Sequence, residues 1–413
     1  MEAFDLKRKL LLGAAVGGVR SDGAFPGHPW AEWCARTRPR DAEAFRAADH
    51  WENWRVDAAL MHSMTLQCCR YTVDWARIEP EEGRFDDEAI AHLRDEIIYM
   101  RAMGIHVVLV LHVFSEPAWF QRLGGWSKQD NISFFLAYTE KLLRTLGHLV
   151  DDYVPISQPN LYVWAGWSIG AWPPGKKTLL GTRQVTGVLC AAHIECYRLI
   201  HALRSELGLR DTRVGASTYM RMLRSKKTKL PTHLTGASAL DKLFQTNMIE
   251  AMACGKFSPA IQNFLRIKKG TFCDFHDLCC YALPASMDGL PGAGHEVNAD
   301  EVIYCAAQLS ALQRRPIFIT KGSGLTAPSP ESVCDCVRAI NEVSLPVEGC
   351  FELAFVDGFS FSRDGEPRIG LVAVNPEDGS RCLRPAGEFL TGLIRNRGVT
   401  EEMCINYGVQ EQA

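Results

Sequence analysis

Long hydrophobic runs are missing from this sequence, and so is a marked excess of charge of either sign. No apolar stretch approaches the roughly 18 residues that a membrane-spanning helix requires, so we expect no contact with a membrane. The 45 Lys and Arg residues nearly balance the 48 Asp and Glu residues, which leaves a net charge of −3 at neutral pH. So small a net charge favours neither nucleic acid nor an anionic surface as a partner.

The 15 cysteines lack the paired spacing of a metal site. The closest pairs, at 68–69, 279–280 and 334–336, do not form the repeated C-x2-C pattern of structural zinc sites. The first residues, M-E-A-F-D-L-K, also lack the basic-then-apolar order of a signal peptide. We therefore expect buried, reduced thiols in a cytoplasmic protein, and we predict neither a metal nor another cofactor.

Of the residues, 47% are hydrophobic and 23% are charged. This composition is typical of a globular protein with a large core. No proline-rich or Ser/Gly-rich linker divides the chain, and no internal repeat is visible. We therefore expect one domain that spans residues 1–413.

Short apolar runs alternate with segments of helical periodicity along the whole chain. Helical periodicity is clearest at 87–103 and 132–149. Repeated strand–helix alternation favours a parallel sheet, and eight strands favour its closure into a barrel. We predict a single (β/α)8 TIM barrel with helical and loop insertions, in which chemistry belongs at the carboxyl ends of the strands. The eight predicted strands are 10–15, 66–73, 106–112, 153–157, 213–217, 273–278, 316–320 and 350–356.

Several segments, in order along the chain, resemble the retaining β-glycosidases of glycoside hydrolase family 1. R-Y-T-V-D-W-A-R-I at 70–78 is similar to the family's R-F-S-I-x-W-x-R-I. P-I-F-I-T at 316–320 is similar to P-I-Y-I-T, and R-I-G-L-V at 368–372 to R-F-G-L-V. Shorter matches are L-G-A-A at 12–15, A-D-H-W at 48–51, G-G-W at 124–126 and P-P-G at 173–175. The resemblance implies the family's barrel.

The same resemblance implies that both catalytic carboxylates are replaced. Retaining glycosidases use an acid/base and a nucleophile whose carboxyl groups lie about 5–5.5 Å apart. The family's T-x-N-E-P corresponds to P-I-S-Q-P at 155–159, which puts Gln158 at the acid/base position. Its I-T-E-N-G corresponds to I-T-K-G-S at 319–323, which puts Lys321 at the nucleophile position. An amide transfers no proton, and an ammonium cannot attack as a carboxylate does.

Most sugar-binding positions of the family are also changed, whereas Arg70 and Tyr281, which hold the nucleophile in the family, are retained. A pyranose needs a stacking aromatic ring and several fixed hydrogen-bonding groups, so this loss weakens sugar binding. The substituted positions hold Arg20, Val113, Ser157, Cys279, Leu353, Ser360 and Phe361.

Arg20, Arg70 and Lys321 are expected around one side of the pocket. Three cations without a carboxylate between them would lower the pKa of Lys321 unless an anion joined them. The alternative is that Lys321 swings out of the pocket or pairs with a nearby acid such as Asp74 or Glu116. Glu116 is otherwise expected to be a solvated loop charge.

Two classes of function follow. The first is a pseudoenzyme or repurposed pocket that binds a small, sugar-like ligand or a protein partner, with an anionic or phosphorylated ligand as the specific hypothesis. The second is an active enzyme with a rewired mechanism, either an O-glycosyl hydrolase or a lysine-based lyase that uses Lys321. A 6-phospho-β-glucosidase is one form of the hydrolase, because Ser360 matches the first residue of the phosphate clamp in that branch. Pro367 and Ile369 do not match the other two, although Arg363 could substitute. The oligomeric state is left open.

Overall fold

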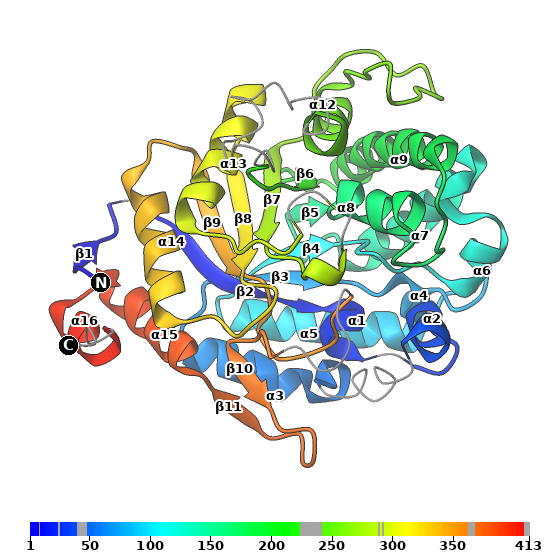
Figure 1. The fold of residues 1–413 in the computed structure, drawn as a ribbon. Coiled ribbons are helices and arrows are strands. Elements are labelled where there is room, and N and C mark those ends of the chain that lie inside the picture. Colours follow the sequence, from blue (N-terminus) through cyan, green and yellow to red (C-terminus); the bar gives the residue numbers. More distant parts are fainter. Residues whose placement is uncertain are drawn as a thin grey trace.

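The computed structural model describes residues 1–7, 9–23, 25–38, 48–223, 242–287, 290, 293–361 and 368–408. Eight parallel strands close into a barrel in chain order, with β2 hydrogen-bonded to both β3 and β9 (Figure 1). Each predicted strand overlaps one of them, so the predicted TIM barrel is confirmed. The strands are β2 (Leu11–Gly17), β3 (Cys68–Thr72), β4 (His106–Val110), β5 (Asp152–Val154), β6 (Arg213–Tyr219), β7 (Phe275–Tyr281), β8 (Ile317–Gly322) and β9 (Val347–Glu352).

The barrel interior is filled by apolar side chains from alternate strand positions. A cluster of seven buried residues occupies it: Cys68, Val108, Val110, Val154, Phe275, Phe318 and Phe351. Successive side chains of a strand point to opposite faces, so the residues two positions further along, among them Arg70, Asp277 and Thr320, also face inward. The barrel interior is therefore a packed apolar core, and the layer of side chains nearest the carboxyl ends of the strands carries the polar groups.

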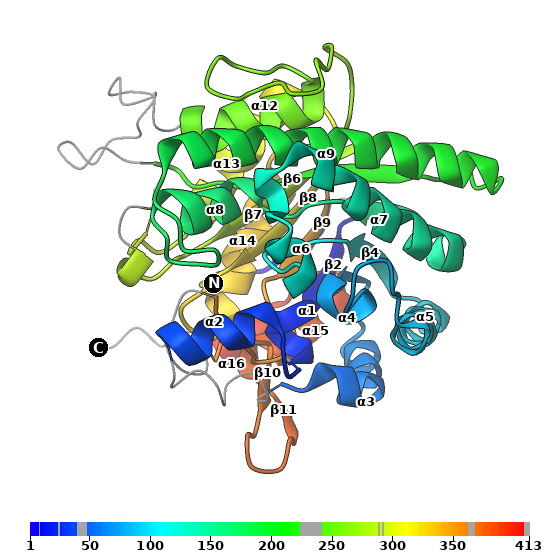
Figure 2. The same ribbon diagram turned by 90° about the vertical axis from the view of Figure 1, so that its right-hand side faces the viewer.

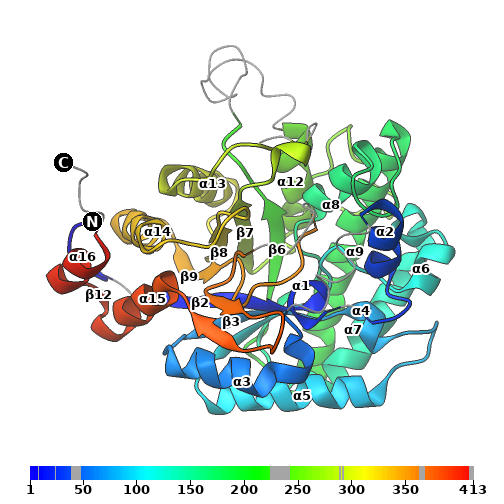
Figure 3. The same cartoon turned by 60° about the horizontal axis from the view of Figure 1, so that its bottom comes forward.

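Helices surround the barrel, as the views in Figures 1, 2 and 3 show. The two predicted helices are confirmed as α5 and α7, which end at Ala102 and Leu146, one and three residues before the predicted ends. Asp86 caps α5, since its carboxylate accepts from the Ala89 N–H at 2.9 Å. The helices are α1 (Gly18–Asp22), α2 (Pro29–Thr37), α3 (His50–Ser63), α4 (Trp75–Ile78), α5 (Asp87–Ala102), α6 (Ala118–Arg122), α7 (Ile132–Leu146), α8 (Pro159–Val163), α9 (Leu179–Glu206), α12 (Asn247–Cys254), α13 (Ala299–Leu312), α14 (Pro330–Glu342), α15 (Pro385–Asn396) and α16 (Glu401–Tyr407).

Two small sheets lie outside the barrel. The N-terminal strand β1 (Phe4–Asp5) pairs with β12 (Gly398–Val399), so segments from the two ends of the chain lie side by side (Figure 1). The hairpin of β10 (Val372–Val374) and β11 (Arg381–Leu383) projects beside α3 (Figure 3). Of the helices in the described ranges, none combines the length and the hydrophobicity needed to cross a bilayer.

Candidate functional site

A small cavity, here called the mouth cavity, lies where the carboxyl ends of the strands converge. Its volume is about 40 Å³. Glycines and small residues of β2 and α1 form one wall, and larger side chains from other strand ends form the rest. The lining side chains that carry the argument below are Arg20, Arg70, Val113, Phe114, Gln158, Thr320, Leu353 and Phe361.

Arg70 reaches the cavity from β3 and is fully ion-paired. Its Nε and Nη2 donate to the two carboxylate oxygens of Asp277 at 3.2 and 2.8 Å, and Nη2 also donates to Ser157 Oγ at 2.6 Å. Ser217 donates to the same Asp277 carboxylate at 2.6 Å. Burial would lower the pKa of Arg70, but Asp277 outweighs it and the pKa is raised. Arg70 is therefore a structural cation with its own counter-ion, and not a free anion site.

Gln158 follows β5 in a left-handed conformation with φ of 49°. Its backbone N–H donates to Ser217 Oγ at 3.1 Å, and its side-chain oxygen accepts from the Tyr281 hydroxyl at 2.6 Å. Its amide nitrogen is 3.4 Å from Ser157 Oγ. Burial raises the pKa of Tyr281, so this hydroxyl remains a donor. The predicted neighbours Ser157, Gln158 and Tyr281 thus lie together, but the amide is locked into hydrogen bonds with protein groups.

Lys321 does not face the mouth cavity, and the prediction that three cations share one pocket is wrong. Phe318 and Thr320 of β8 point inward, so Lys321, one position further on, points outward to the helix layer. Its Nζ lies 2.6 Å from Glu352 Oε1, on the neighbouring strand β9, and donates to the Ser332 carbonyl at 3.3 Å.

The expected lowering of the Lys321 pKa is also wrong. Burial acts in that direction, but the Glu352 carboxylate outweighs it and raises the pKa. The prediction that Lys321 pairs with an acidic residue is confirmed, but the partner is Glu352. The two residues suggested, Asp74 and Glu116, contact other side chains. Asp74 lies 3.4 Å from His28 Nε2. Glu116 is buried and accepts from the Tyr162 hydroxyl at 2.6 Å, so the prediction of a solvated loop charge is wrong as well.

Arg20 is the cation that remains at the mouth. It lines the mouth cavity and an adjoining space of about 20 Å³ that includes Tyr281 and Ser360. Its guanidinium lies 5.5 Å from the ring centre of Phe361, and no carboxylate of the described residues lies within 4 Å of it. Burial and the charge of Arg70 both lower the pKa of Arg20.

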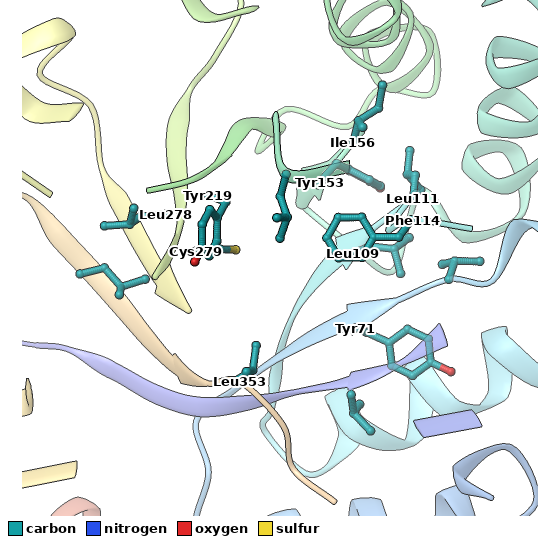
Figure 4. Packing of buried hydrophobic residues seen from close by; sticks show 14 of the residues in the cluster. Tyr71, Leu109, Leu111, Phe114, Tyr153, Ile156, Tyr219, Leu278, Cys279 and Leu353 are labelled. Atoms are coloured by element: carbon teal, nitrogen blue, oxygen red, sulfur yellow. The ribbon is translucent and has the colours of Figure 1, made fainter. Parts of the chain in front are cut away.

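The other ligand-binding positions predicted from the sequence hold apolar side chains or side chains that already contact other protein groups. Cys279 is buried 4.0 Å from Asp277 Oδ2, and burial raises its pKa to about 12. Figure 4 draws Cys279, Phe114 and Leu353 among the buried hydrophobic side chains. Phe361 packs against Phe114 and Trp30 at ring-centre distances of 5.2 and 4.9 Å. Arg363 and Pro367 lie outside the described residues, whereas Ile369 is buried.

The lining of the mouth cavity and its adjoining space contains no Asp or Glu among the described residues. A retaining glycosidase needs two carboxyl groups facing the scissile bond. Ligand pockets are also typically about 300–1,000 Å³, and this cavity is far smaller. The geometry can hold a small group beside a guanidinium, an amide and a phenol.

Sequence reasoning missed Asp277, Ser217, Thr320 and Glu352. The alternation of β7, F-H-D-L-C-C-Y, carried a signal, because Asp277 is two positions from the inward Phe275. The same period-two rule places Lys321 outside the barrel.

Comparison with known proteins shows the family to which the chain is similar. The family model described as glycosyl hydrolase family 1 matches residues 14–289, about two thirds of the chain. The match ends before β8, so it does not include Lys321.

Curated relatives include a coniferin β-glucosidase of Pinus contorta, 32% identical over 38% of this chain and 31% of its own length. A galactolipid galactosyltransferase of Arabidopsis thaliana is 25% identical over 54% of this chain and 40% of its own length. The matched segments thus span less than half of these relatives.

Solved structures match over nearly the whole chain. A β-glycosidase from Pyrococcus horikoshii has a TM-score of 0.83 and 23% identity, and covers 99% of both chains. A β-glucosidase from Thermotoga maritima in complex with castanospermine has a TM-score of 0.82 and 16% identity, over 96% of this chain and 100% of its own. At these identities the likeness establishes the fold.

Proposed function

The chain belongs to glycosyl hydrolase family 1, and from this premise we propose that it is a divergent member without classical β-glycosidase activity. In this proposal its mouth cavity binds a small anionic group through Arg20. The observation that carries the proposal is a cavity of about 40 Å³ whose described lining holds the paired Arg70, the guanidinium of Arg20 and no carboxylate.

The absence of hydrolysis follows from the roles that the reaction requires. Gln158 neither donates nor accepts the proton that a leaving glycosidic oxygen needs, and its oxygen is already bonded to Tyr281. Lys321 lies behind the barrel wall as the partner of Glu352. If the described lining of the mouth holds neither an acid/base nor a nucleophile, as we propose, the two-step mechanism has no first step.

The anionic ligand class follows from Arg20. The Arg20 side chain is half-buried, and a guanidinium binds a carboxylate, phosphate or sulfate through strong charge-assisted hydrogen bonds. Arg70 is paired with Asp277 and Lys321 with Glu352, so among the described residues Arg20 is the cation at the mouth that has no carboxylate partner. The Tyr281 ring lines the same adjoining space.

The relatives named β-glucosidases favour the alternative of a family member that hydrolyses glycosides by a rewired mechanism. A lysine-based lyase is disfavoured, because the Lys321 ammonium is ion-paired and faces away from the mouth cavity.

The first test measures hydrolysis of 4-nitrophenyl β-glucoside, β-galactoside and their 6-phosphates. We expect no turnover above background by the wild type or by Gln158→Glu, because the second carboxylate is still missing. Rates in the ordinary enzyme range, about 1–10³ s⁻¹, would establish the rewired hydrolase instead.

The second test measures thermal stability with phosphate, sulfate or acetate at constant ionic strength. Binding to the folded state alone raises the melting temperature by mass action. We expect such a rise in the wild type and its loss in Arg20→Gln. Arg94→Gln, at an exposed surface pair with Asp95, serves as the control and should respond as the wild type does. An equal rise in all three proteins would exclude Arg20 as the anion site.

A further inference from the structure

The mouth cavity and its adjoining space share a wall. Arg20, Leu353 and Phe361 line both of them, and their volumes are about 40 and 20 Å³. Because one water molecule needs about 10–15 Å³, the mouth cavity has room for about three water-sized groups and the adjoining space for about one. Such a space accepts a carboxylate group, whereas a pyranose ring with its hydroxyl groups is too large.

The Phe361 ring is the rigid part of this wall. It is buried, and four other aromatic rings lie 4.9 to 5.8 Å from it between ring centres, those of Trp30, Phe114, Trp172 and Phe359. Most of these pairs are edge-to-face, an arrangement that is favourable beyond the area that it buries. The ring cannot turn aside without breaking these contacts, so it gives the mouth cavity a fixed boundary.

Arg20, the cation of the mouth, lies against the same ring. Its guanidinium carbon is 5.5 Å from the ring centre of Phe361, within the range of a cation–π contact. The two segments are also joined through their backbones, because the Phe359 N–H donates to the Arg20 carbonyl oxygen at 2.8 Å. The fold therefore places the guanidinium and the ring relative to each other.

Polar groups lie on both sides of the shared wall. Gln158 and Thr320 line the mouth cavity, whereas Tyr281 and Ser360 line the adjoining space. The Tyr281 hydroxyl donates to the Gln158 side-chain oxygen at 2.6 Å, so one hydrogen bond connects the linings of the two spaces. Without the Phe361 ring the two spaces would form a single larger site with a guanidinium, hydroxyl groups and an amide. These are the groups that bind a carboxylic acid carrying several hydroxyls.

We propose that Phe361 sets the size limit of the mouth site and thereby determines its specificity. With the ring in place, the site accepts a free small oxyanion such as acetate and excludes an anionic group that is carried on a sugar. The inference rests on the proposed function in one respect, which is that Arg20 binds the anionic group. It deepens that function by naming the ligand class and the residue that selects it.

Thermal-shift titrations of the full chain with acetate and with glucuronate, at constant ionic strength, test this size limit. We expect the wild type to bind glucuronate at least about tenfold more weakly than acetate, as a fixed apolar wall provides. In Phe361→Ala the affinity for glucuronate should rise by at least about tenfold. Phe389→Ala is the matched control, because it truncates a buried ring on α15 that lines neither space, and it should discriminate as the wild type does.

A neutral probe separates this inference from the anion binding proposed for Arg20. Benzene needs only the apolar space that the Phe361 ring leaves, so it should raise the melting temperature of Phe361→Ala and not that of the wild type. Stabilisation of Phe361→Ala by benzene, without anion binding by any of the proteins, would support the wall and contradict the anion site.

Phe361→Leu keeps the test available if the alanine variant does not fold, and it should show a smaller gain in glucuronate affinity in the same direction. The inference is overturned if the wild type binds glucuronate as tightly as acetate. It is also overturned, with the anion site intact, if Phe361→Ala binds acetate but responds to neither glucuronate nor benzene.

Discussion

Asp22 shows at the scale of one residue how burial sets a charge state. Its Oδ2 accepts from the Gly18 N–H at 2.8 Å, whereas its Oδ1 is buried without a hydrogen-bond partner. Burial raises the pKa of Asp22 to about 7, against the charges of His50 and Arg77, and Glu96 and Asp74 add to the increase. Asp22 ends α1, the helix that carries Arg20 to the mouth cavity.

The raised pKa predicts a pH dependence of stability. Between about pH 4 and pH 7 the folded chain retains a proton on Asp22 that the unfolded chain has released, so stability falls as the pH rises through this window. Asp22→Asn carries no such charge. We expect this variant to be more stable than the wild type above pH 7, by about 2–4 kcal/mol, and equal to it near pH 4.

Urea unfolding of both proteins at pH 4, 5.5 and 7.5 measures this difference. Asp378→Asn is the control, because Asp378 lies on the surface and the hydrogen bonds that its carboxylate accepts from Ser380 lower its pKa. A constant offset between wild type and Asp22→Asn across pH would show that Asp22 is ionised in the folded protein.

At the scale of elements, the seam between β8 and β9 is held by a buried ion pair. Lys321 and Glu352 are register partners on these two strands, and Ser332 links Lys321 to α14. A buried charge that loses its partner is strongly destabilising, whereas replacing both charges by apolar groups is tolerated. The pair thus ties two strands and one helix together.

We therefore expect Lys321→Met to lower the free energy of unfolding by about 3–5 kcal/mol, and Lys321→Met with Glu352→Leu to recover most of the loss. Urea titration followed by circular dichroism measures both. Lys141→Met removes an exposed pair with Asp87 and should cost less than about 1 kcal/mol. A double variant as unstable as the single one would mean that packing, and not charge, holds this seam.

At the scale of the whole molecule, closure of the barrel joins strands that are far apart in the chain. β2 pairs with β9, and β1 near the start pairs with β12 near the end. A fragment of residues 1–223 holds β2 to β6, and one of residues 242–413 holds β7 to β9. Each fragment would expose two strand edges and the core side chains that the other fragment covers.

We expect neither fragment alone to show a cooperative urea transition or near-ultraviolet circular dichroism, because each leaves its strand edges unpaired. The full chain measured under the same conditions is the reference. A fragment with its own cooperative transition would show that the chain holds two folding units.

The sequence by itself determined the barrel, since strand–helix alternation is a local pattern repeated along the chain. It located eight strands and the helices α5 and α7 to within a few residues, and it placed Arg70, Ser157, Gln158 and Tyr281 at the strand ends. It did not identify the counter-ions. Only the tertiary structure decided that Arg70 pairs with Asp277, 207 residues away, and that Lys321 pairs with Glu352 outside the barrel. The physical reason is that the local sequence determines which side chains of a strand point inward and which outward. The ion-pair partners of these side chains depend on the register between neighbouring strands, which forms only when the barrel closes.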